Sequence, residues 1–337
     1  MHPLAQAVLA GDVRKTARAC RVCDDRLPGH LELLRDLYPH TGRAYVLGVT
    51  GNPGAGKSTV TNQLIGAYRE RGQKVAVVAI DPSSPFSGGA ILGDRIRMQR
   101  HFEDPSVFIR SVATRGALGG LSRSSLDVAR VLAAWGADVV IIETVGVGQD
   151  ELEIVKAAHT VLVVAAPGLG DEIQAIKAGL LECADVFAVN KADRDGADAT
   201  ARDLELMIAL SGEVKSAGAH SRRHAAGHLD LAKQTVAHAD GAWVPRVVKC
   251  VASKGEGTAA LLASLDAHRA WLASPEGVTR AAARQVELLR ASLKDAILDA
   301  AALALDAEIE RMSARVAARE LDPYSAVEEL VRAFRRG

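Results

Sequence analysis

The chain has 337 residues, of which 41 are lysine or arginine and 41 are aspartate or glutamate, so its formal net charge is zero. This balance differs from the basic excess of most nucleic-acid-binding domains, and no apolar run approaches the length of a membrane-spanning helix. The first residues show no signal-peptide pattern, and four cysteines in a chain of this length fit a reducing compartment. We therefore expect a cytoplasmic protein with neither a membrane nor a nucleic acid as its partner.

Residues 1–40 are expected to form a helical extension. Apolar residues recur there at helical spacing in two stripes, separated by Pro28-Gly29. Cys20 and Cys23 form a C-x-x-C pair within this helical pattern. A metal or redox site is one interpretation, but zinc needs two more ligands, none of which lies nearby, and a redox pair usually follows a strand. Two helical cysteines without such a role are the favoured interpretation.

A glycine-rich segment lies between an apolar run and a helical pattern, which is the context of a phosphate-binding P-loop. Its glycines let successive backbone N–H groups point at phosphate oxygens. Its lysine can reach the β- and γ-phosphates and act in catalysis, and its serine hydroxyl can bind Mg²⁺. The residues assigned to the nucleotide are Gly51, Asn52, Pro53, Gly54, Ala55, Gly56, Lys57, Ser58 and Thr59. This segment predicts that the protein binds a nucleoside triphosphate.

Apolar runs rich in β-branched residues alternate with amphipathic stretches through the central part of the chain. The runs lie at 45–50, 75–80, 107–112, 138–142, 160–166, 184–189 and 246–251. The alternation predicts an α/β fold, a P-loop NTPase with a mostly parallel, doubly wound sheet of roughly seven strands. In such sheets ligands bind at the carboxyl ends of the strands, so the residue that follows each run becomes a candidate for the site.

Three acidic residues are candidate magnesium ligands together with Ser58. Asp81 follows the second strand, Asp94 ends a glycine-rich loop, and Glu143 ends the fourth strand at the Walker B position. Asp81 and Asp94 have an alternative interpretation as a helix cap and a surface residue. Glu143, which stands where many GTPases have aspartate, is also assigned to catalysis. Gly146 can offer its backbone N–H to the γ-phosphate.

An N-K-x-D motif follows the sixth run directly and indicates how the base is read. The Asp193 carboxylate can accept hydrogen bonds from guanine N1–H and N2–H₂, which adenine cannot supply. After the last run, Ala252 can present its backbone N–H to the guanine carbonyl. The residues assigned to the base are Asn190, Lys191, Asp193, Val251, Ala252 and Ser253. The predicted nucleotide is therefore GTP, with GDP as the product.

Two segments outside these motifs have more than one interpretation. The glycine-bracketed loop at 168–170 is either a further switch or a plain turn that Asp171 caps. Residues 211–242 depart from regular helix and strand patterns, and His220, His224 and His228 recur there every four residues. A solvated basic insertion is favoured over a metal site, because no complete ligand set accompanies the histidines.

The last part of the chain reads as a helical arm. Its apolar residues recur at alternating spacings of three and four, as in a helix-packing seam: Val286, Leu289, Leu293, Ala296, Ala300 and Leu303. Asp322-Pro323 then supplies the N-cap and N1 residues of another helix. The arm forms an interface or packs back onto its own core, and both interpretations stay open. The expected domains are 1–40, 41–274 with an insertion near 211–242, and 275–337.

Together these motifs resemble the MeaB/ArgK family of SIMIBI-class P-loop GTPases, the chaperones of adenosylcobalamin-dependent acyl-CoA mutases. The likeness covers nearly the whole chain, and its most specific parts are the segments that begin at Asp81 and Glu143. Further matching segments are 41–44, the P-loop, 91–95, 190–193, 268–272 and 323–326. Two departures stand out. The 211–242 segment is longer than the family pattern, and Val251 replaces the usual serine before Ala252.

The resemblance implies a homodimer held by the C-terminal arm. It also implies GTP-gated delivery of cobalamin to a mutase of the methylmalonyl-CoA type, with protection or reactivation of that mutase. It assigns Asp171, Gln174 and Lys177 to a further switch that couples the mutase to hydrolysis. Gln149 stands three residues beyond Gly146, too far to act as the glutamine of small GTPases, so hydrolysis without the partner should be slow. A nickel- or cobalt-insertion GTPase is the alternative that the cysteine pair and the histidines keep open.

Overall fold

The computed structural model describes residues 1–81, 101, 103–113, 123–144, 158–168, 184–220 and 241–336. They divide into two compact units, Met1–Thr279 and Arg280–Gly337, which we describe separately. None of the helices in these ranges is both long enough and apolar enough to cross a bilayer.

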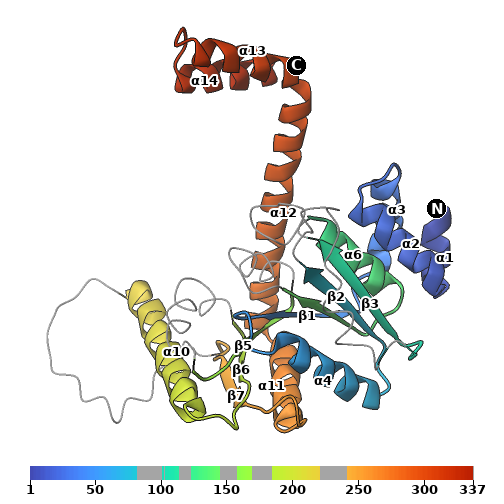
Figure 1. Ribbon diagram of the computed structural model, residues 1–337, viewed down its shortest axis with the longest axis vertical. Coiled ribbons are helices and arrows are strands. Elements are labelled where there is room, and N and C mark those ends of the chain that lie inside the picture. The colour runs from blue at the N-terminus through green and yellow to red at the C-terminus, as the bar shows by residue number, and fades with distance from the viewer. Residues whose placement is uncertain are drawn as a thin grey trace, which may run out of the picture. The chain divides into compact units, whose positions relative to one another are not determined.

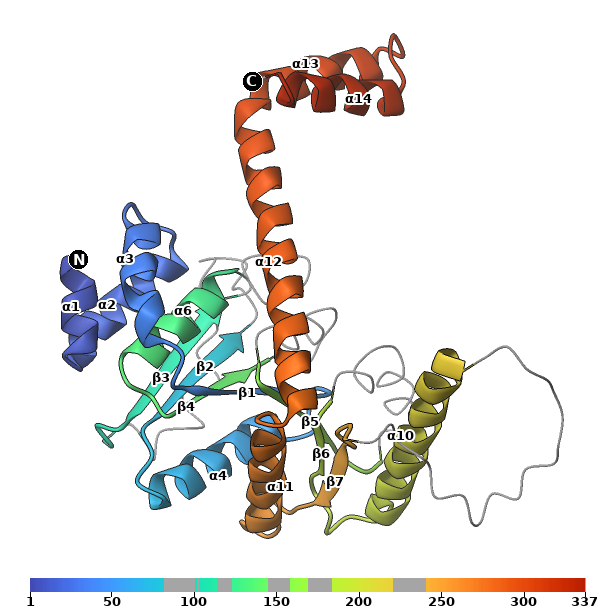
Figure 2. The ribbon, with the colours of Figure 1, turned by 180° about the vertical axis from the view of Figure 1, so that it is seen from behind.

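The first unit is built on a seven-stranded sheet in the order β3-β2-β4-β1-β5-β6-β7 (Figures 1 and 2). Every neighbouring pair of strands runs parallel. The strands are β1 Tyr45–Thr50, β2 Val75–Asp81, β3 Val107–Ala113, β4 Val139–Glu143, β5 Thr160–Ala165, β6 Val186–Val189 and β7 Arg246–Lys249. This is the P-loop NTPase α/β fold, as predicted, and each predicted run carries one strand.

Helices cover both faces of the sheet, and this explains why its strands read as continuous apolar runs. Every residue of β4 and of β5 is buried. Leu47 and Val49 of β1 pack with Leu64 on one face, and Ile142 of β4 packs with Val131 on the other. Among the described helices, α4 (Lys57–Glu70) and α11 (Thr258–Trp271) cover one face, and α6 (Arg123–Ala134) and α10 (Ala197–His220) cover the other. Helices α4 and α11 lie side by side along their face (Figure 2).

The predicted helical extension packs against α6 and joins the same apolar core. It consists of α1 Pro3–Leu9, α2 Val13–Asp24, α3 His30–Leu37 and the 3₁₀ turn η1 Tyr38–His40. Cys20 and Cys23 both lie on α2, are fully buried and form no disulfide. Burial raises the pKa of each thiol to about 12. The prediction that both cysteines lie on a helix is confirmed.

The expectation that regular structure ends at residue 211 is wrong, because α10 continues to His220. Strong helix formers dominate residues 213–217, and an isolated glycine within a helix costs only about 1 kcal/mol relative to alanine. Gly212 and Gly218 therefore do not stop the helix. Of the three spaced histidines, only the backbone of His220 lies within the described residues, and the structure does not describe His224 or His228.

The second unit contains most of α12 (Pro275–Ala304), followed by α13 (Asp306–Ala317) and α14 (Pro323–Phe334). Helices α13 and α14 pack together, with Arg315 and Glu329 3.5 Å apart. The Asp322 carboxylate accepts the N–H groups of Tyr324 and Ser325, each at 3.0 Å, so the predicted N-cap is confirmed. Large apolar side chains along α12 are not covered by α13 or α14. They include Leu289, Leu293 and Leu303, which are 72%, 57% and 85% exposed.

Candidate functional site

The loop between β1 and α4 has a conformation that only glycine permits at two positions. Gly51 and Gly56 have φ angles of 129° and 91°, in the left-handed half of the map. A Cβ atom on Gly51 would collide with the Val164 carbonyl of β5, and one on Gly56 would collide with the Asn190 side-chain amide. The loop therefore fits tightly between strand β5 and Asn190, and it ends at the first residue of α4. That helix N-terminus adds a positive dipole end suited to phosphate.

The Lys57 ammonium lies inside the curl of this loop. Its side chain is buried, and Nζ donates hydrogen bonds to the carbonyls of Gly51 at 2.6 Å and Asn52 at 3.0 Å. A cation held in this way is already positioned when a phosphate arrives, so little side-chain entropy is lost on binding. Of the other loop residues assigned to the nucleotide, Pro53 and Gly54 are exposed, and Thr59 is exposed in the first turn of α4.

The two strongest candidate metal ligands touch each other. The Ser58 hydroxyl donates to Glu143 Oε1 at 2.6 Å, and both residues are buried. The contact follows from the topology, because β4 lies beside β1 with Glu143 opposite Val49, one residue before the end of β1. Thr144 lies next to Glu143, and its hydroxyl donates to the Thr50 hydroxyl at 2.9 Å. This second buried contact fixes the same pair of strand ends.

This donor set fits a magnesium ion. Mg²⁺ prefers oxygen ligands and binds through one or two protein oxygens together with phosphate oxygens. A hydroxyl and a carboxylate lie at hydrogen-bond distance beside the P-loop. The backbone of Asp81 ends β2, two residues beyond Ala79, the partner of Glu143 in the neighbouring strand. Asp81 therefore lies at the same edge of the sheet as Glu143.

Asn190 connects the base-reading motif to the P-loop. Its buried side chain follows β6, donates from Nδ2 to the Ala55 carbonyl at 2.9 Å, and accepts the Ala252 N–H at 3.0 Å. Lys191, next along the chain, donates from Nζ to the Gly54 carbonyl at 2.7 Å. The predicted phosphate and base segments therefore form one hydrogen-bonded assembly. A guanine carbonyl that used the Ala252 N–H would share this donor with Asn190 or take it over.

The carboxylate assigned to guanine pairs with a lysine from the base loop, which comprises residues 250–257. Asp193 Oδ2 lies 3.2 Å from Lys254 Nζ, and both side chains are about half exposed. The Lys254 hydrogen bond holds the pKa of Asp193 below its usual value. Asp193 is therefore an ionised acceptor at neutral pH. In the same loop Val251 is buried, its N–H donating to the Glu256 carbonyl at 2.9 Å, and Ser253 is exposed.

Several predicted site residues lie outside the described ranges, and the structure gives no geometry for them. They are Asp94, Gly146, Asp171, Gln174 and Lys177. Only the backbone of Asp81 is described. Within the described ranges, no group of three or more His, Cys, Asp and Glu side chains could hold a metal ion.

Two further residues were not predicted from the sequence. Lys254 follows Ser253 but had no assigned role, and its proximity to Asp193 depends on how two loops fold together. Gln63, on α4, donates to the Ala252 carbonyl at 2.7 Å across 189 positions of sequence. No spacing rule connects positions so far apart, so only the folded structure reveals this contact.

Comparison with known proteins decides the family. A family profile described as "Methylmalonyl Co-A mutase-associated GTPase MeaB" matches residues 16–306. The chain belongs to the MeaB family. A Pyrococcus abyssi protein named as a GTPase is 42% identical to this MeaB-family chain over 335 residues, which cover 98% of this chain and 95% of the relative. Escherichia coli GTPase ArgK is 41% identical over 202 residues, which cover 56% of this chain and 61% of ArgK.

A solved structure supports the same assignment. A crystal structure titled LAO/AO transport system kinase superposes with a TM-score of 0.64 at 26% sequence identity, covering 98% of this chain and 96% of that one. Family, relatives and fold agree with the P-loop and N-K-x-D geometry. This MeaB-family protein is therefore an enzyme that hydrolyses GTP to GDP and phosphate.

Proposed function

We propose that this GTPase uses GTP hydrolysis to gate the delivery of adenosylcobalamin to a cobalamin-dependent acyl-CoA mutase of the methylmalonyl-CoA type, and to protect or reactivate that mutase. The observation that carries the proposal is the family match over residues 16–306, whose description names association with methylmalonyl-CoA mutase. The nucleotide site supports it, because one hydrogen-bonded assembly joins the phosphate and base motifs expected of a GTPase.

In this proposal different residues of the protein bind the phosphates, the base and the metal ion. The P-loop N–H groups and Lys57 bind the β- and γ-phosphates, and Asp193 accepts the guanine N1–H and N2–H₂ groups. Ser58 and Glu143, with Asp81 and Asp94, would hold Mg²⁺, which neutralises phosphate charge when bound. The Gly146 N–H would contact the γ-phosphate, so that the loop carrying Gly146 senses hydrolysis. No glutamine stands next to Gly146, so a partner completes the transition state, with Asp171, Gln174 and Lys177 as the coupling residues.

The proposed assembly is a cytoplasmic homodimer that uses the arm at 275–337. The exposed apolar residues of α12 support this interface, because a seam with helical periodicity that α13 and α14 do not cover is suited to another helix. The arm would follow a GTPase domain at 41–274 and a helical extension at 1–40. This division leaves the nucleotide motifs and the interface on separate segments.

The test is cofactor loading of an apo-mutase. Adenosylcobalamin transfer would be followed by mutase activity in the presence of GTP, GDP or a non-hydrolysable GTP analogue, with Lys57→Ala as the control that cannot respond to the triphosphate. We expect active mutase to form faster with GTP than with the analogue, and no nucleotide dependence with Lys57→Ala. Equal loading with all three nucleotides by the wild-type protein would contradict the proposal.

A further inference from the structure

Ala252 is held by hydrogen bonds at both ends of its backbone. Its N–H donates to Asn190 Oδ1 at 3.0 Å, and its carbonyl accepts from Gln63 Nε2 at 2.7 Å. Asn190 follows β6, whereas Gln63 lies on α4, so two separate elements fix one residue of the base loop. Side chains on rigid helices and strands hold a loop more accurately than other loops do.

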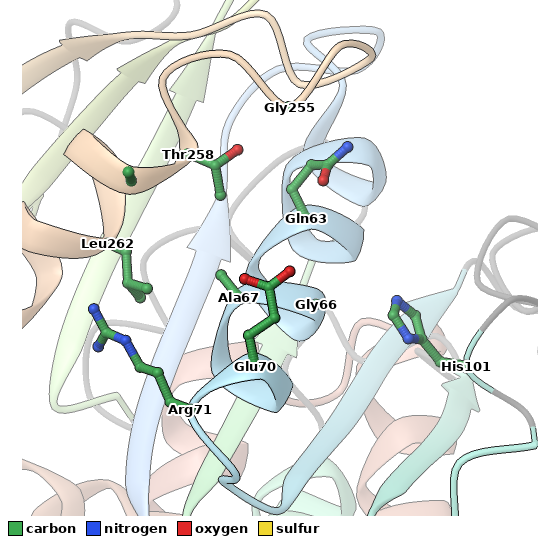
Figure 3. Close-up of a pocket in the computed structure, with 10 residues that line it drawn as sticks. Gln63, Gly66, Ala67, Glu70, Arg71, His101, Gly255, Thr258 and Leu262 are labelled. Atoms are coloured by element: carbon green, nitrogen blue, oxygen red, sulfur yellow. The ribbon is translucent and has the colours of Figure 1, made fainter.

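Gln63 stands at the head of a groove between α4 and α11. In Figure 3 its side chain projects from α4 towards the loop that carries Gly255, and Thr258 lies across from it on the other wall. The groove has a volume of about 630 Å³, and small residues line its middle. Glu70 lies on the same helix seven positions further on, also on the groove, where it is exposed. The two side chains therefore share one face of α4 but meet different surroundings.

Helix α4 carries residues from both ends of the proposed nucleotide site. Its first turn carries Lys57 and Ser58, which belong to the phosphate and metal end of the site. About one and a half turns later it carries Gln63, which contacts the base loop. A helix is stiff over this length, so the distance between phosphate and base contacts is set by α4 as well as by Asn190.

We propose that Gln63 is a positioning residue for guanine, which holds the Ala252 peptide in place and thereby slows nucleotide release. The inference rests on the guanine site proposed above, since Ala252 belongs to that site. The Gly255 N–H also reaches the Ala252 carbonyl, at 3.3 Å, so loss of Gln63 does not leave this oxygen without a donor. The effect is therefore the loss of one hydrogen bond, which corresponds to about a two- to tenfold change in an equilibrium or rate constant.

The experiment measures the release of fluorescent N-methylanthraniloyl-GDP (mant-GDP), chased with excess unlabelled GDP, from four full-length proteins. Gln63→Glu keeps the shape and replaces the donor with an acceptor, and Gln63→Met removes the donor. Glu70→Met is the matched control on the same face of α4. We expect about two- to tenfold faster release from Gln63→Met, still faster release from Gln63→Glu, and wild-type release from Glu70→Met. The single-turnover rate constant at saturating GTP should stay unchanged, while the GTP concentration that gives half of this rate should rise.

Three results would overturn the inference. If Gln63→Glu released mant-GDP at the wild-type rate, the hydrogen bond from Gln63 to the Ala252 carbonyl would not position the base loop. A lower hydrolysis rate with unchanged release would place Gln63 in the chemistry instead. Equal acceleration by Glu70→Met would show a general loosening of α4. If the wild-type protein held mant-GDP no more tightly than mant-ADP, the guanine site itself would fail, and that failure is visible before any variant is made.

Discussion

Replacing Asn190 with alanine should weaken the whole nucleotide site before any nucleotide binds. The substitution removes the donor to the Ala55 carbonyl and the acceptor of the Ala252 N–H, and both of those residues are buried, at 0% and 3% exposed. A buried polar group left without its partner costs about 1–3 kcal/mol. Two such groups give an expected loss of about 2–5 kcal/mol in the free energy of unfolding, after partial relaxation of the loops.

Urea denaturation of the nucleotide-free protein measures this loss directly. With a denaturant dependence of about 3 kcal/mol per molar urea, the midpoint should fall by roughly 1 M. Asn190→Asp should also lose stability, because it keeps an acceptor for the Ala252 N–H but sets a carboxylate oxygen against the Ala55 carbonyl. Ser253→Ala, at an exposed position of the same loop, is the control and should leave the midpoint unchanged. An Asn190→Ala midpoint equal to the wild-type value would refute the idea that this side chain holds the two loops together.

The base-reading motif, the C-terminal arm and the buried cysteines give further predictions. Asp193→Asn should exchange GTP for xanthosine triphosphate, because the amide pairs with the xanthine edge; retained preference for GTP in competition binding would contradict the base assignment. Truncation before Val286 should give a monomer that still binds GTP, and a dimer seen by light scattering would move the interface elsewhere. Because burial raises the pKa of Cys20 and Cys23 to about 12, both thiols should resist alkylation at pH 8.5 until the protein unfolds. The folded state should also lose stability as pH rises above about 9 towards 12, since only the unfolded thiols ionise there. Rapid labelling of the native protein would contradict this burial.

The sequence predicted most of the sheet because its strands are buried on both faces. Runs such as Val139–Ile142 are apolar without interruption, which marks a central parallel strand and sets its ends within a residue or two. The P-loop and the N-K-x-D motif were predictable for a different reason. Their residues are close in sequence, so spacing alone defines the chemistry that they share.

Contacts between distant segments could not be predicted in the same way. Ser58 and Glu143 were both expected near the metal, but their direct hydrogen bond depends on β4 lying beside β1. The contacts of His268 could not be predicted from the sequence either. It is fully buried, its Nδ1 lies 2.7 Å from the Thr160 hydroxyl, and its Nε2 lies 3.4 Å from Asp185. No helical periodicity reveals that α11 brings this imidazole to the start of two strands.

The rate of GTP hydrolysis with and without an adenosylcobalamin-dependent acyl-CoA mutase tests the central claim most directly. Single-turnover rates would be measured for the wild-type protein and for Lys177→Ala. The account predicts slow hydrolysis by the wild-type protein alone and clear stimulation by the mutase. For Lys177→Ala it predicts an intrinsic rate within a few-fold of the wild-type rate and no stimulation. A wild-type rate that the mutase does not change would contradict a mutase-coupled GTPase, and equal stimulation of both proteins would remove Lys177 from the coupling.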